Sequence, residues 1–501
     1  MAGNLLYYGD NLTVLRDQIK DESVDLIYLD PPFNSQANYN LLFKAPSGSE
    51  SHAQVEAFED TWHWGETAEH AFDEVMSSGN TNVSELLRAM RDFLKENDMM
   101  AYLTMMAVRL IELHRVLKPM GSLYLHCDPT ASHYLKILLD AIFDPKTFIN
   151  EVVWQRTSAH NDPSRYGRVH DVLLFYGKGD SHVWNQGYEV PDQTYFTAHD
   201  FEHDEHGKLY RKRDLTAPAH GHESGQFAWK GKHAPKGRMW SYSEENMVRL
   251  EAEGRIVYTK TGMPRLKIYA DNLKGVPHQD VWANRDLWLN AGASERLGYP
   301  TQKPLALLER IIGASSSEGD LVLDPFCGCG TTIHAAHKLG RRWIGIDVTH
   351  LAISLIEKRL TDAFPGIEYE VHGTPKDLEG ARDLASRDKY QFQWWAGSLV
   401  NAIPFGGKKK GADSGIDGII YFKDFKKDHK GAAIGWVTEK IIVSVKGGEN
   451  VSVAMIRDLA HVVTREKAKL GSSSPWRSRP IRCARRRWRK AISKPAAAAS
   501  I

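Results

Sequence analysis

The 501-residue sequence has few cysteines, no long apolar run and almost no net charge. Four cysteines exclude a disulfide-stapled scaffold and suit a reducing compartment, so we expect a cytoplasmic protein. No stretch approaches the roughly 20 apolar residues of a membrane helix. The first residues lack a basic region followed by an apolar core, so no secretory signal is expected. At roughly 150 residues per domain, the length predicts about three domains.

The net charge of +1 hides an uneven distribution. Residues 471–501 hold nine Lys or Arg and no acidic residue, which leaves a net charge of −8 on the rest of the chain. A body of this kind is no general polycation, so nucleic acid would have to bind to a local basic face. Because periodicity disappears at residue 471, we predict a disordered basic tail or a shifted reading frame over 471–501. A folded basic arm is the alternative.

Short apolar strands alternate with helical patterns in both the first and the later parts of the chain. This alternation predicts an α/β fold with a parallel sheet. The segment 151–298 is rich in His, Arg, Trp and Tyr and poor in periodic runs, so we expect an insertion of short strands and loops there. The predicted strands are 24–29, 122–127, 321–324, 342–347, 418–422 and 440–445, and the predicted helices are 102–117, 304–312, 332–339, 349–360, 388–402 and 451–469.

A glycine-rich turn, Asp324-Pro-Phe-Cys-Gly-Cys-Gly-Thr-Thr332, separates a predicted strand from a predicted helix. Its glycines allow a tight turn, and the helix start offers free N–H groups to a ligand. No lysine follows, which excludes a phosphate-cradling NTPase loop, and Ile333 replaces the third glycine of the dinucleotide fingerprint. Asp347 ends the next predicted strand, at a position that reaches a ribose diol in doubly wound sheets.

Cysteine and histidine spacing offers two zinc alternatives. A C-x-C pair inside a turn has poor ligand geometry, and histidines at i, i+4 and i+7 are equally consistent with a polar surface. We therefore predict no metal site. The two sets are Cys327 and Cys329 with His334 and His337, and His199 with His203 and His206.

A second turn, Asp30-Pro31-Pro32-Phe33, follows directly on the predicted strand 24–29. Two prolines stiffen it and remove N–H donors, so a carboxylate, a bare carbonyl and an aromatic ring meet at the carboxyl edge of the sheet. This set fits an exocyclic amino group on a flat ring. Asp30 and the Pro31 carbonyl can each accept one N–H, and Phe33 can stack on the ring. Accepting both hydrogens makes the amino nitrogen more nucleophilic.

Together with Gly9-Asp10-Asn11 and Tyr299-Pro-Thr-Gln-Lys-Pro-Leu305, these turns resemble a known family. The sequence is similar to amino-group DNA methyltransferases that use S-adenosylmethionine, of the permuted (beta) type in which the catalytic half precedes the cofactor half. The similarity covers about residues 4–375 and implies a Rossmann-like doubly wound sheet. Cys329 stands where the family commonly has Ser. The implied catalytic residues are Asp30, Pro31, Pro32 and Phe33, and the implied cofactor-binding residues are Asp10, Thr301, Lys303, Asp324, Phe326, Gly328, Gly330, Thr331 and Asp347.

The resemblance implies methyl transfer from S-adenosylmethionine to the N6 amino group of adenine in double-stranded DNA, because this form of the proline turn usually accompanies adenine. The target base would be flipped out of the duplex. A cytosine-N4 methyltransferase and an inactive DNA-binding fragment are the alternatives. A restriction–modification role is expected, with a second copy or a partner subunit as candidate protein partners and no membrane.

Target recognition is expected from 151–298, where basic residues alternate with Trp and Tyr. Such mixtures supply phosphate contacts, base-edge readers and stacking surfaces. The candidate DNA-binding residues are Arg156, Arg165, Arg168, Arg238, Arg265 and Lys267.

A further pattern lies near the C-terminus. Asp417 begins one predicted strand, and Ser444-Val-Lys446 ends the next. The arrangement resembles restriction-endonuclease-like cores, in which an Asp and an acid-x-Lys hold Mg²⁺ and support the attacking water. Ser444 occupies the acid position, and a hydroxyl is a poor Mg²⁺ ligand. An active, Mg²⁺-dependent nuclease, a non-cleaving DNA-binding relic and an unrelated structure all stay open.

These patterns divide the chain into five parts. We predict a catalytic half of the methyltransferase domain at 1–150, a target-recognition insert at 151–298, a cofactor-binding half at 299–375, a small α/β endonuclease-like domain at 376–470, and the basic tail at 471–501.

Overall fold

The computed structural model divides the described chain into two compact units. The first comprises residues 1–185 with 280–501, and the second comprises residues 186–279. None of the helices in the described part of the chain combines the length and apolar content that a bilayer crossing needs. The structure describes residues 3–32, 38–44, 50–59, 63–159, 161–191, 193–219, 225–289, 293, 295–297, 299, 301–400, 402–405, 415–427, 433–446, 453–475 and 497–500.

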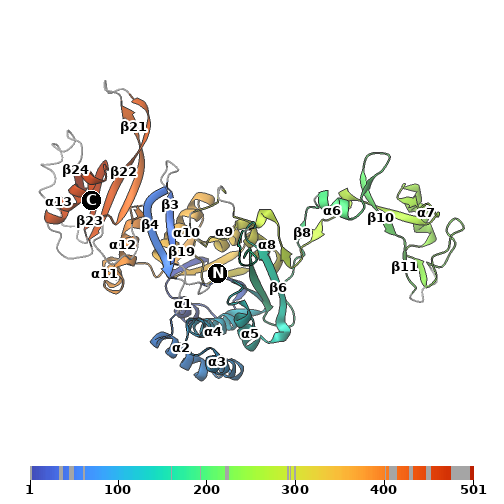
Figure 1. Cartoon of the computed structure of the whole chain (residues 1–501), viewed down its shortest axis with the longest axis horizontal. Coiled ribbons are helices and arrows are strands. Elements are labelled where there is room, and N and C mark those ends of the chain that lie inside the picture. The colour runs from blue at the N-terminus through green and yellow to red at the C-terminus, as the bar shows by residue number, and fades with distance from the viewer. Residues whose placement is uncertain are drawn as a thin grey trace. The chain divides into compact units, whose positions relative to one another are not determined.

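A nine-stranded sheet forms the centre of the first unit (Figure 1), in the order β16-β6-β7-β5-β2-β17-β18-β1-β19. Only β7 runs antiparallel to its neighbours. Because β2 and β17 are parallel neighbours, their carboxyl ends meet at one edge although Asp324 lies 295 positions after Leu29 in the chain. The strands are β1 (Asn4–Tyr8), β2 (Val24–Leu29), β5 (Leu117–Cys127), β6 (Phe148–Gln155), β7 (His170–Gly177), β16 (Val281–Trp282), β17 (Leu321–Asp324), β18 (Arg342–Asp347) and β19 (Tyr369–His372).

Helices cover both faces of this sheet, as an α/β pattern predicts. Alternation along β2 shows how. Ile27 and Leu29 pack with α1, α4 and α5 on one face, whereas Leu26 and Tyr28 pack with α8, α9 and α10 on the other. Figure 1 shows helices on both sides of the sheet. The helices are α1 (Asn11–Gln18), α2 (Glu66–Ser77), α3 (Thr81–Leu94), α4 (Asp98–Val116), α5 (Ser132–Phe143), α8 (Leu305–Ser315), α9 (Thr331–Lys338) and α10 (His350–Ala363).

The predicted strands at 24–29, 321–324 and 342–347 are confirmed, and the predicted helices around them are confirmed to within a few residues at their ends. Helices α2 and α3 were not expected as full elements. Charged residues interrupt their sequences, but Val83, Leu87 and Met90 recur at helical spacing and are buried against the core. A hairpin, β3 (Asn38–Lys44) with β4 (Glu50–Glu59), lies in the same region.

The insertion is shorter than the expected 151–298. Strands β6 and β7 belong to the main sheet because β7 pairs with β5 along 172–177, and β6 pairs with β7. The second unit, 186–279, has its own apolar core around Trp229, Trp240 and Met247. It contains α6 (Gln193–Ala198), α7 (Glu244–Ala252) and the strands β8 (Tyr188–Glu189), β9 (Glu202–His203), β10 (Leu209–Asp214), β11 (Thr216–Pro218), β12 (Arg238–Trp240), β13 (Ile256–Tyr258), β14 (Pro264–Tyr269) and β15 (Val276–Pro277).

A five-stranded sheet follows near the C-terminus, in the order β20-β21-β22-β23-β24. The segment 471–501 was expected to be disordered, but residues 471–475 and 497–500 are in strands. Residues 476–496 lie outside the described residues. Strand β23 pairs in parallel with β22 through backbone groups, which needs no side-chain periodicity. The elements are α11 (Leu378–Arg387), α12 (Lys389–Ser398), β20 (Ile403–Pro404), β21 (Gly418–Lys427), β22 (Ala433–Lys446), α13 (Val453–Arg465), β23 (Leu470–Pro475) and β24 (Ala497–Ser500).

Candidate active site

One cavity of about 420 Å³ lies at the carboxyl edge of the main sheet and brings the two predicted turns together. Asp30, Pro31 and Pro32 line it from the end of β2, and Phe33 lies outside the described residues. From the other turn, Asp324, Phe326, Gly328 and Thr331 line the same cavity. Parallel neighbouring strands explain this meeting, because their following loops emerge side by side.

Asp347 connects the end of β18 to the glycine-rich turn. Its Oδ2 accepts a hydrogen bond from the Gly328 N–H at 3.0 Å, and its Oδ1 accepts one from the Thr349 N–H at 2.8 Å. Burial raises the pKa of Asp347 to about 6, although these hydrogen bonds oppose the shift. The carboxylate is thus held in place while it still faces the cavity.

Gly330 stands at the start of α9 and does not line the cavity. Its φ of +74° is left-handed, and a Cβ atom there would lie 2.7 Å from Cγ1 of Ile356 on α10. The glycine therefore sets the tight approach of the turn to α10. Beside it, burial raises the pKa of Asp324 to about 7, and its Oδ1 accepts the Phe326 N–H at 3.0 Å.

Asp10 caps α1 and belongs to a polar cluster that the sequence patterns did not reveal. Its Oδ1 accepts the Thr13 N–H at 3.1 Å, and its Oδ2 pairs with Arg109 at 2.9 Å. Arg109 also donates to Asn11 at 2.7 Å, and Asn11 donates to the Pro325 carbonyl at 2.9 Å. An arginine inside the apolar run of helix α4 was the available signal, since such a residue is rarely buried without a partner.

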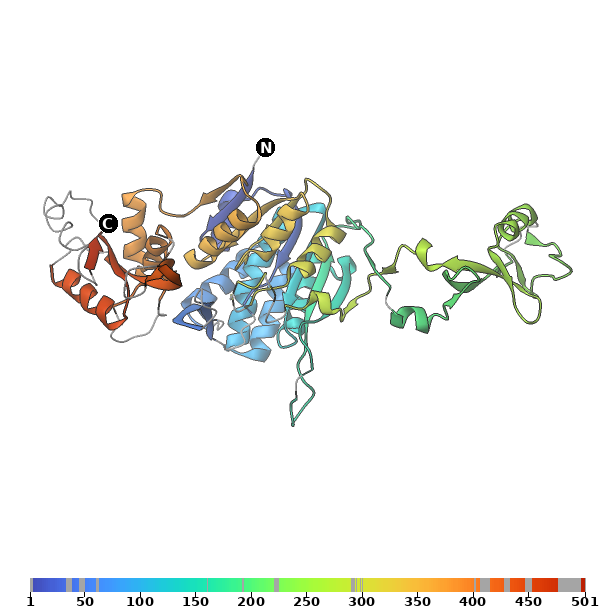
Figure 2. The same ribbon diagram turned by 90° about the horizontal axis from the view of Figure 1, so that it is seen from above.

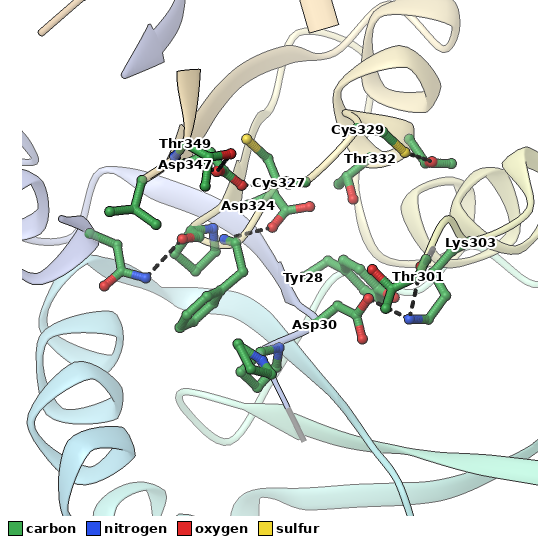
Figure 3. Close-up of a pocket in the computed structure, with 18 of the residues that line it drawn as sticks. Tyr28, Asp30, Thr301, Lys303, Asp324, Cys327, Cys329, Thr332, Asp347 and Thr349 are labelled. Carbon is green, nitrogen blue, oxygen red and sulfur yellow. Dashed lines mark hydrogen bonds and ion pairs between the residues drawn. The ribbon is translucent and has the colours of Figure 1, made fainter. Parts of the chain in front are cut away.

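Lys303 joins the two halves of the site. Its Nζ forms an ion pair with Asp30 Oδ2, and it contacts the Thr301 carbonyl at 3.4 Å. Both Lys303 and Asp30 are largely buried, with side-chain exposures of 11% and 15%. Figure 3 shows Asp30 directed toward Lys303, with Asp324 and Asp347 further along the same pocket.

The expected DNA-binding residues fall in both units, three in each, and in the second unit Arg238 and Arg265 both pair with Asp214. Arg156 follows β6 and pairs with Asp171 at 3.1 Å, Arg165 pairs with Asp162 at 2.9 Å, and Arg168 is exposed. These three lie in the connection between β6 and β7, which extends from the sheet in Figure 2. In the second unit, Arg265 pairs with Asp214 at 2.8 Å, Arg238 donates to the Thr216 hydroxyl at 2.7 Å, and Lys267 lies 5.2 Å from the ring centroid of Tyr210.

The C-terminal residues Asp417 and Ser444 do meet. Asp417 Oδ2 accepts hydrogen bonds from the Ser444 hydroxyl at 3.2 Å and the Val445 N–H at 2.6 Å, and its Oδ1 accepts one from Gln393 of α12 at 2.9 Å. Lys446 ends β22 two residues after Ser444. The part of the chain that the structure describes holds no group of three or more His, Cys, Asp or Glu arranged to bind a metal, so neither zinc candidate forms there.

A helix-covered, mostly parallel sheet with a cavity at its carboxyl edge defines a Rossmann-like α/β protein with a small-molecule site. A family model described as DNA methylase, of the N6/N4 type, matches residues 24–358. The chain belongs to this DNA methylase family.

Two curated proteins and one solved structure are among those that the chain resembles. The chain is 31% identical over 362 residues to the type II methyltransferase M.EcaI of Enterobacter cloacae, covering 72% of this chain and 69% of that protein. It is 28% identical over 354 residues to the StyLTI Mod subunit, a type III restriction-modification enzyme of Salmonella typhimurium, covering 67% of this chain and 50% of that protein. The solved PvuII DNA methyltransferase, described as cytosine-N4-specific, is 11% identical with a TM-score of 0.35, covering 81% of this chain and 95% of that one.

Proposed function

We propose that this chain is a site-specific DNA methyltransferase of the permuted type, which transfers a methyl group from S-adenosylmethionine to the N6 amino group of adenine in duplex DNA. The observation that carries the proposal is the shared cavity. Asp30 at the end of β2 and the Gly328 turn after β17 line one space, and Lys303 bridges toward Asp30. An amino-group acceptor site and a cofactor site must adjoin for direct transfer between them.

The cavity residues fit S-adenosylmethionine. Its volume lies within the range of ligand pockets, and the buried Asp347 carboxylate offers acceptors suited to ribose hydroxyls. Asp324, Phe326, Gly328 and Thr331 would surround the methionine part, with Gly330 shaping the turn behind them, and Asp10 would lie near the adenine. Thr301 and Lys303 would close the pocket. The bound cofactor supplies an electrophilic methyl group.

The protein's contribution is to position and polarise the amino group of the target base. Asp30 and the Pro31 carbonyl would accept its two hydrogens, and Phe33 would stack on the ring. Pro32 keeps the turn rigid, since proline fixes φ. Lys303 keeps one Asp30 oxygen in an ion pair, so the carboxylate stays available as an acceptor at its other oxygen.

Adenine N6 is proposed over cytosine N4 because an aspartate stands at position 30 of the proline turn. The base must leave the stack to reach such a cavity, so base flipping is part of the proposal. Sequence recognition is assigned to 186–279 together with the β6–β7 connection, which carries Arg156, Arg165 and Arg168. A second copy or a restriction subunit remains a proposed partner.

For the C-terminal domain we propose DNA contact without cleavage. Ser444 replaces the expected acid, and both Asp417 oxygens already accept hydrogen bonds. Through these hydrogen bonds the Asp417 carboxylate, directly before β21, connects that strand to α12 and β22. Plasmid incubated with the chain and Mg²⁺ should stay supercoiled. Nicking that disappears in Asp417→Ala would instead establish a nuclease.

The methyltransferase proposal is tested with the purified full chain. We expect methyl incorporation into duplex DNA from labelled S-adenosylmethionine, and long-read sequencing of DNA from expressing cells should report N6-methyladenine at one sequence context. Asp30→Ala should abolish transfer yet bind cofactor within about twofold of wild type in calorimetry.

Asp92→Ala, on the exposed face of α3, is the matched control and should keep full activity. If the sequencing detects N4-methylcytosine instead of N6-methyladenine, cytosine and not adenine is the target base. Substantial turnover by Asp30→Ala would overturn the catalytic assignment, and a wild-type chain that binds DNA without methylating it would identify an inactive fragment.

A further inference from the structure

Three buried polar side chains lie near Asp30, on the sheet strands next to the cavity. Tyr28 lies on β2, His126 on β5 and Asp171 on β7, and their exposures are 1%, 0% and 4%. The Tyr28 hydroxyl lies 2.9 Å from His126 Nδ1, and His126 Nε2 lies 3.3 Å from Asp171 Oδ2. The three therefore form one hydrogen-bonded row across adjacent strands.

The register of the sheet places this row of side chains next to Asp30. Leu29 pairs with Leu125, so the next residues, Asp30 and His126, lie side by side at the carboxyl edge. His126 Nδ1 lies 4.0 Å from Asp30 Oδ1. One water can bridge such a gap, and catalytic contacts of this length often shorten when substrate binds.

Packing alone does not account for the row. Burying a histidine and a carboxylate costs free energy that apolar side chains of similar size avoid. The carboxylate is nevertheless kept ionised: burial raises the pKa of Asp171, but the hydrogen bond from His126 and the positive charges of Arg156 and Lys303 lower it below its usual value. A buried anion whose partner is a histidine stabilises the protonated form of that ring.

The hydrogen bonds assign the resting tautomer of His126. A carboxylate can only accept, so Nε2 carries the proton toward Asp171, and neutral Nδ1 accepts from the Tyr28 hydroxyl. Nδ1 is thus a proton acceptor directed at the Asp30 side of the site. If Nδ1 gains a proton, the Tyr28 hydroxyl can turn and become the acceptor.

We propose that His126, oriented by Asp171, takes up the proton that the target amino group releases through Asp30 during methyl transfer. The inference rests on the proposed function. The amino nitrogen uses its lone pair to form the new N–C bond, while the methyl–sulfur bond of S-adenosylmethionine breaks and its electron pair goes to sulfur. The nitrogen then loses one N–H bond, whose electron pair stays on nitrogen. The proton passes to Asp30 Oδ1 and then to His126 Nδ1, which becomes imidazolium beside Asp171, and it leaves to water after product release.

Lys303 gives the direction of this transfer. Its ammonium pairs with Asp30 Oδ2, so a proton held on Asp30 would weaken this largely buried ion pair. The proton is therefore passed on instead of being kept. Since His126 acts through Asp30, it is a positioning residue. The ionisable and charged groups around it are Tyr28, Asp30, Asp171, Arg156, Lys303 and Asp324.

The test compares four variants of the full chain: His126→Gln, Asp171→Asn, Tyr28→Phe and His114→Gln. His114 is a half-buried histidine near the end of α4 that packs on Phe143, so its variant is the matched control. Thermal melting checks folding, calorimetry measures S-adenosylmethionine binding, and 2-aminopurine fluorescence reports base flipping. Single-turnover methyl transfer is then measured from pH 5.5 to 9.

We expect the wild-type rate to rise with pH through one midpoint and to level off above it, because the proton acceptor must be unprotonated before transfer. His126→Gln should bind cofactor and flip the base within about twofold of wild type, yet transfer at least tenfold more slowly and without this rise. Asp171→Asn should move the midpoint to lower pH, because the imidazolium loses its counter-charge. His114→Gln should match wild type throughout.

A structural role would lower the rate at every pH and leave the midpoint unchanged. The inference is overturned if His126→Gln keeps the wild-type rate and profile. Should His126→Gln not fold, unchanged midpoints in both Asp171→Asn and Tyr28→Phe would overturn it. A wild-type chain that transfers no methyl group at any pH would overturn the proposed function itself, which separates the two failures.

Discussion

At the scale of single residues, buried carboxylates dominate the chemistry of the cavity. Burial raises the pKa of Asp324 to about 7 and that of Asp347 to about 6. Both groups keep protons in the folded chain to a higher pH than in the unfolded chain. Their effect on the free energy of unfolding therefore has a fixed sign: stability falls as pH rises from about 4 to about 7.

Binding of S-adenosylmethionine should favour the ionised forms of Asp324 and Asp347 over the protonated forms. S-adenosylmethionine carries two cationic groups and hydroxyl donors, which favour ionised carboxylates. We predict that its affinity rises with pH through 6 and 7, and that it is about tenfold weaker at pH 5 than at pH 8, since roughly nine-tenths of a group with a pKa of 6 is protonated at pH 5. Calorimetry in two buffers of different ionisation enthalpy should show proton release.

Asp347→Asn provides the control for this pH effect. The amide keeps the shape of the side chain and cannot titrate, so its weaker binding should depend less on pH than that of wild type. Equal pH dependence in the two proteins would mean that Asp347 is not the group responsible.

At the scale of elements, the junction between β17 and α9 depends on the left-handed Gly330. An alanine there adds the strain of a positive φ and a contact of 2.7 Å with Ile356 on α10. We predict that Gly330→Ala lowers the free energy of unfolding by about 2–4 kcal/mol. Cofactor affinity should fall as well, because the turn that lines the cavity must shift. Thermal melting and calorimetry measure the two effects.

Gly366 offers a matched comparison after the end of α10. Its φ is +84°, and a Cβ atom would meet nothing within 4 Å. Gly366→Ala should therefore cost only the backbone strain, about 1 kcal/mol, and leave cofactor binding unchanged. Equal losses in the two variants would show that the contact with Ile356 contributes nothing.

At the scale of the whole molecule, we propose that the cofactor binds to the first unit and that the second unit supplies part of the sequence recognition. The cavity is lined entirely by residues of the first unit, whereas 186–279 have a separate core. The ends flanking the second unit are fixed in the first. Asn185 donates to the Ser316 carbonyl at 2.9 Å, and the Asp280 carbonyl accepts the Val153 N–H at 2.8 Å.

We predict that replacing 186–279 by a Gly/Ser linker leaves the first unit folded, with cofactor affinity within about threefold of wild type. Methylation at the specific site should fall by at least a hundredfold, because each lost base contact is worth about 1–3 kcal/mol. Melting, calorimetry and long-read sequencing measure these quantities. Retained site-specific methylation would move recognition to the β6–β7 connection.

Much of the fold could be predicted because its signals are local. The apolar run Val24–Leu29 ends at two prolines, and the run Leu321–Asp324 ends at a glycine-rich turn, so strand, turn and helix follow from neighbouring residues. The limits of the insertion could not be read in this way. Strands β6 and β7 are apolar runs inside a largely polar segment, and only the pairing of β7 with β5 and of β6 with β7 assigns them to the main sheet.

The sequence by itself determined the two turns, their chemistry and the alternation of strands and helices, since each depends on a few adjacent residues. Only the tertiary structure decided which side chains meet: Lys303 with Asp30, Arg109 with Asp10, and His126 with both Tyr28 and Asp171. Strand order and register bring these partners together from positions 45 to 273 residues apart, and no local pattern encodes them.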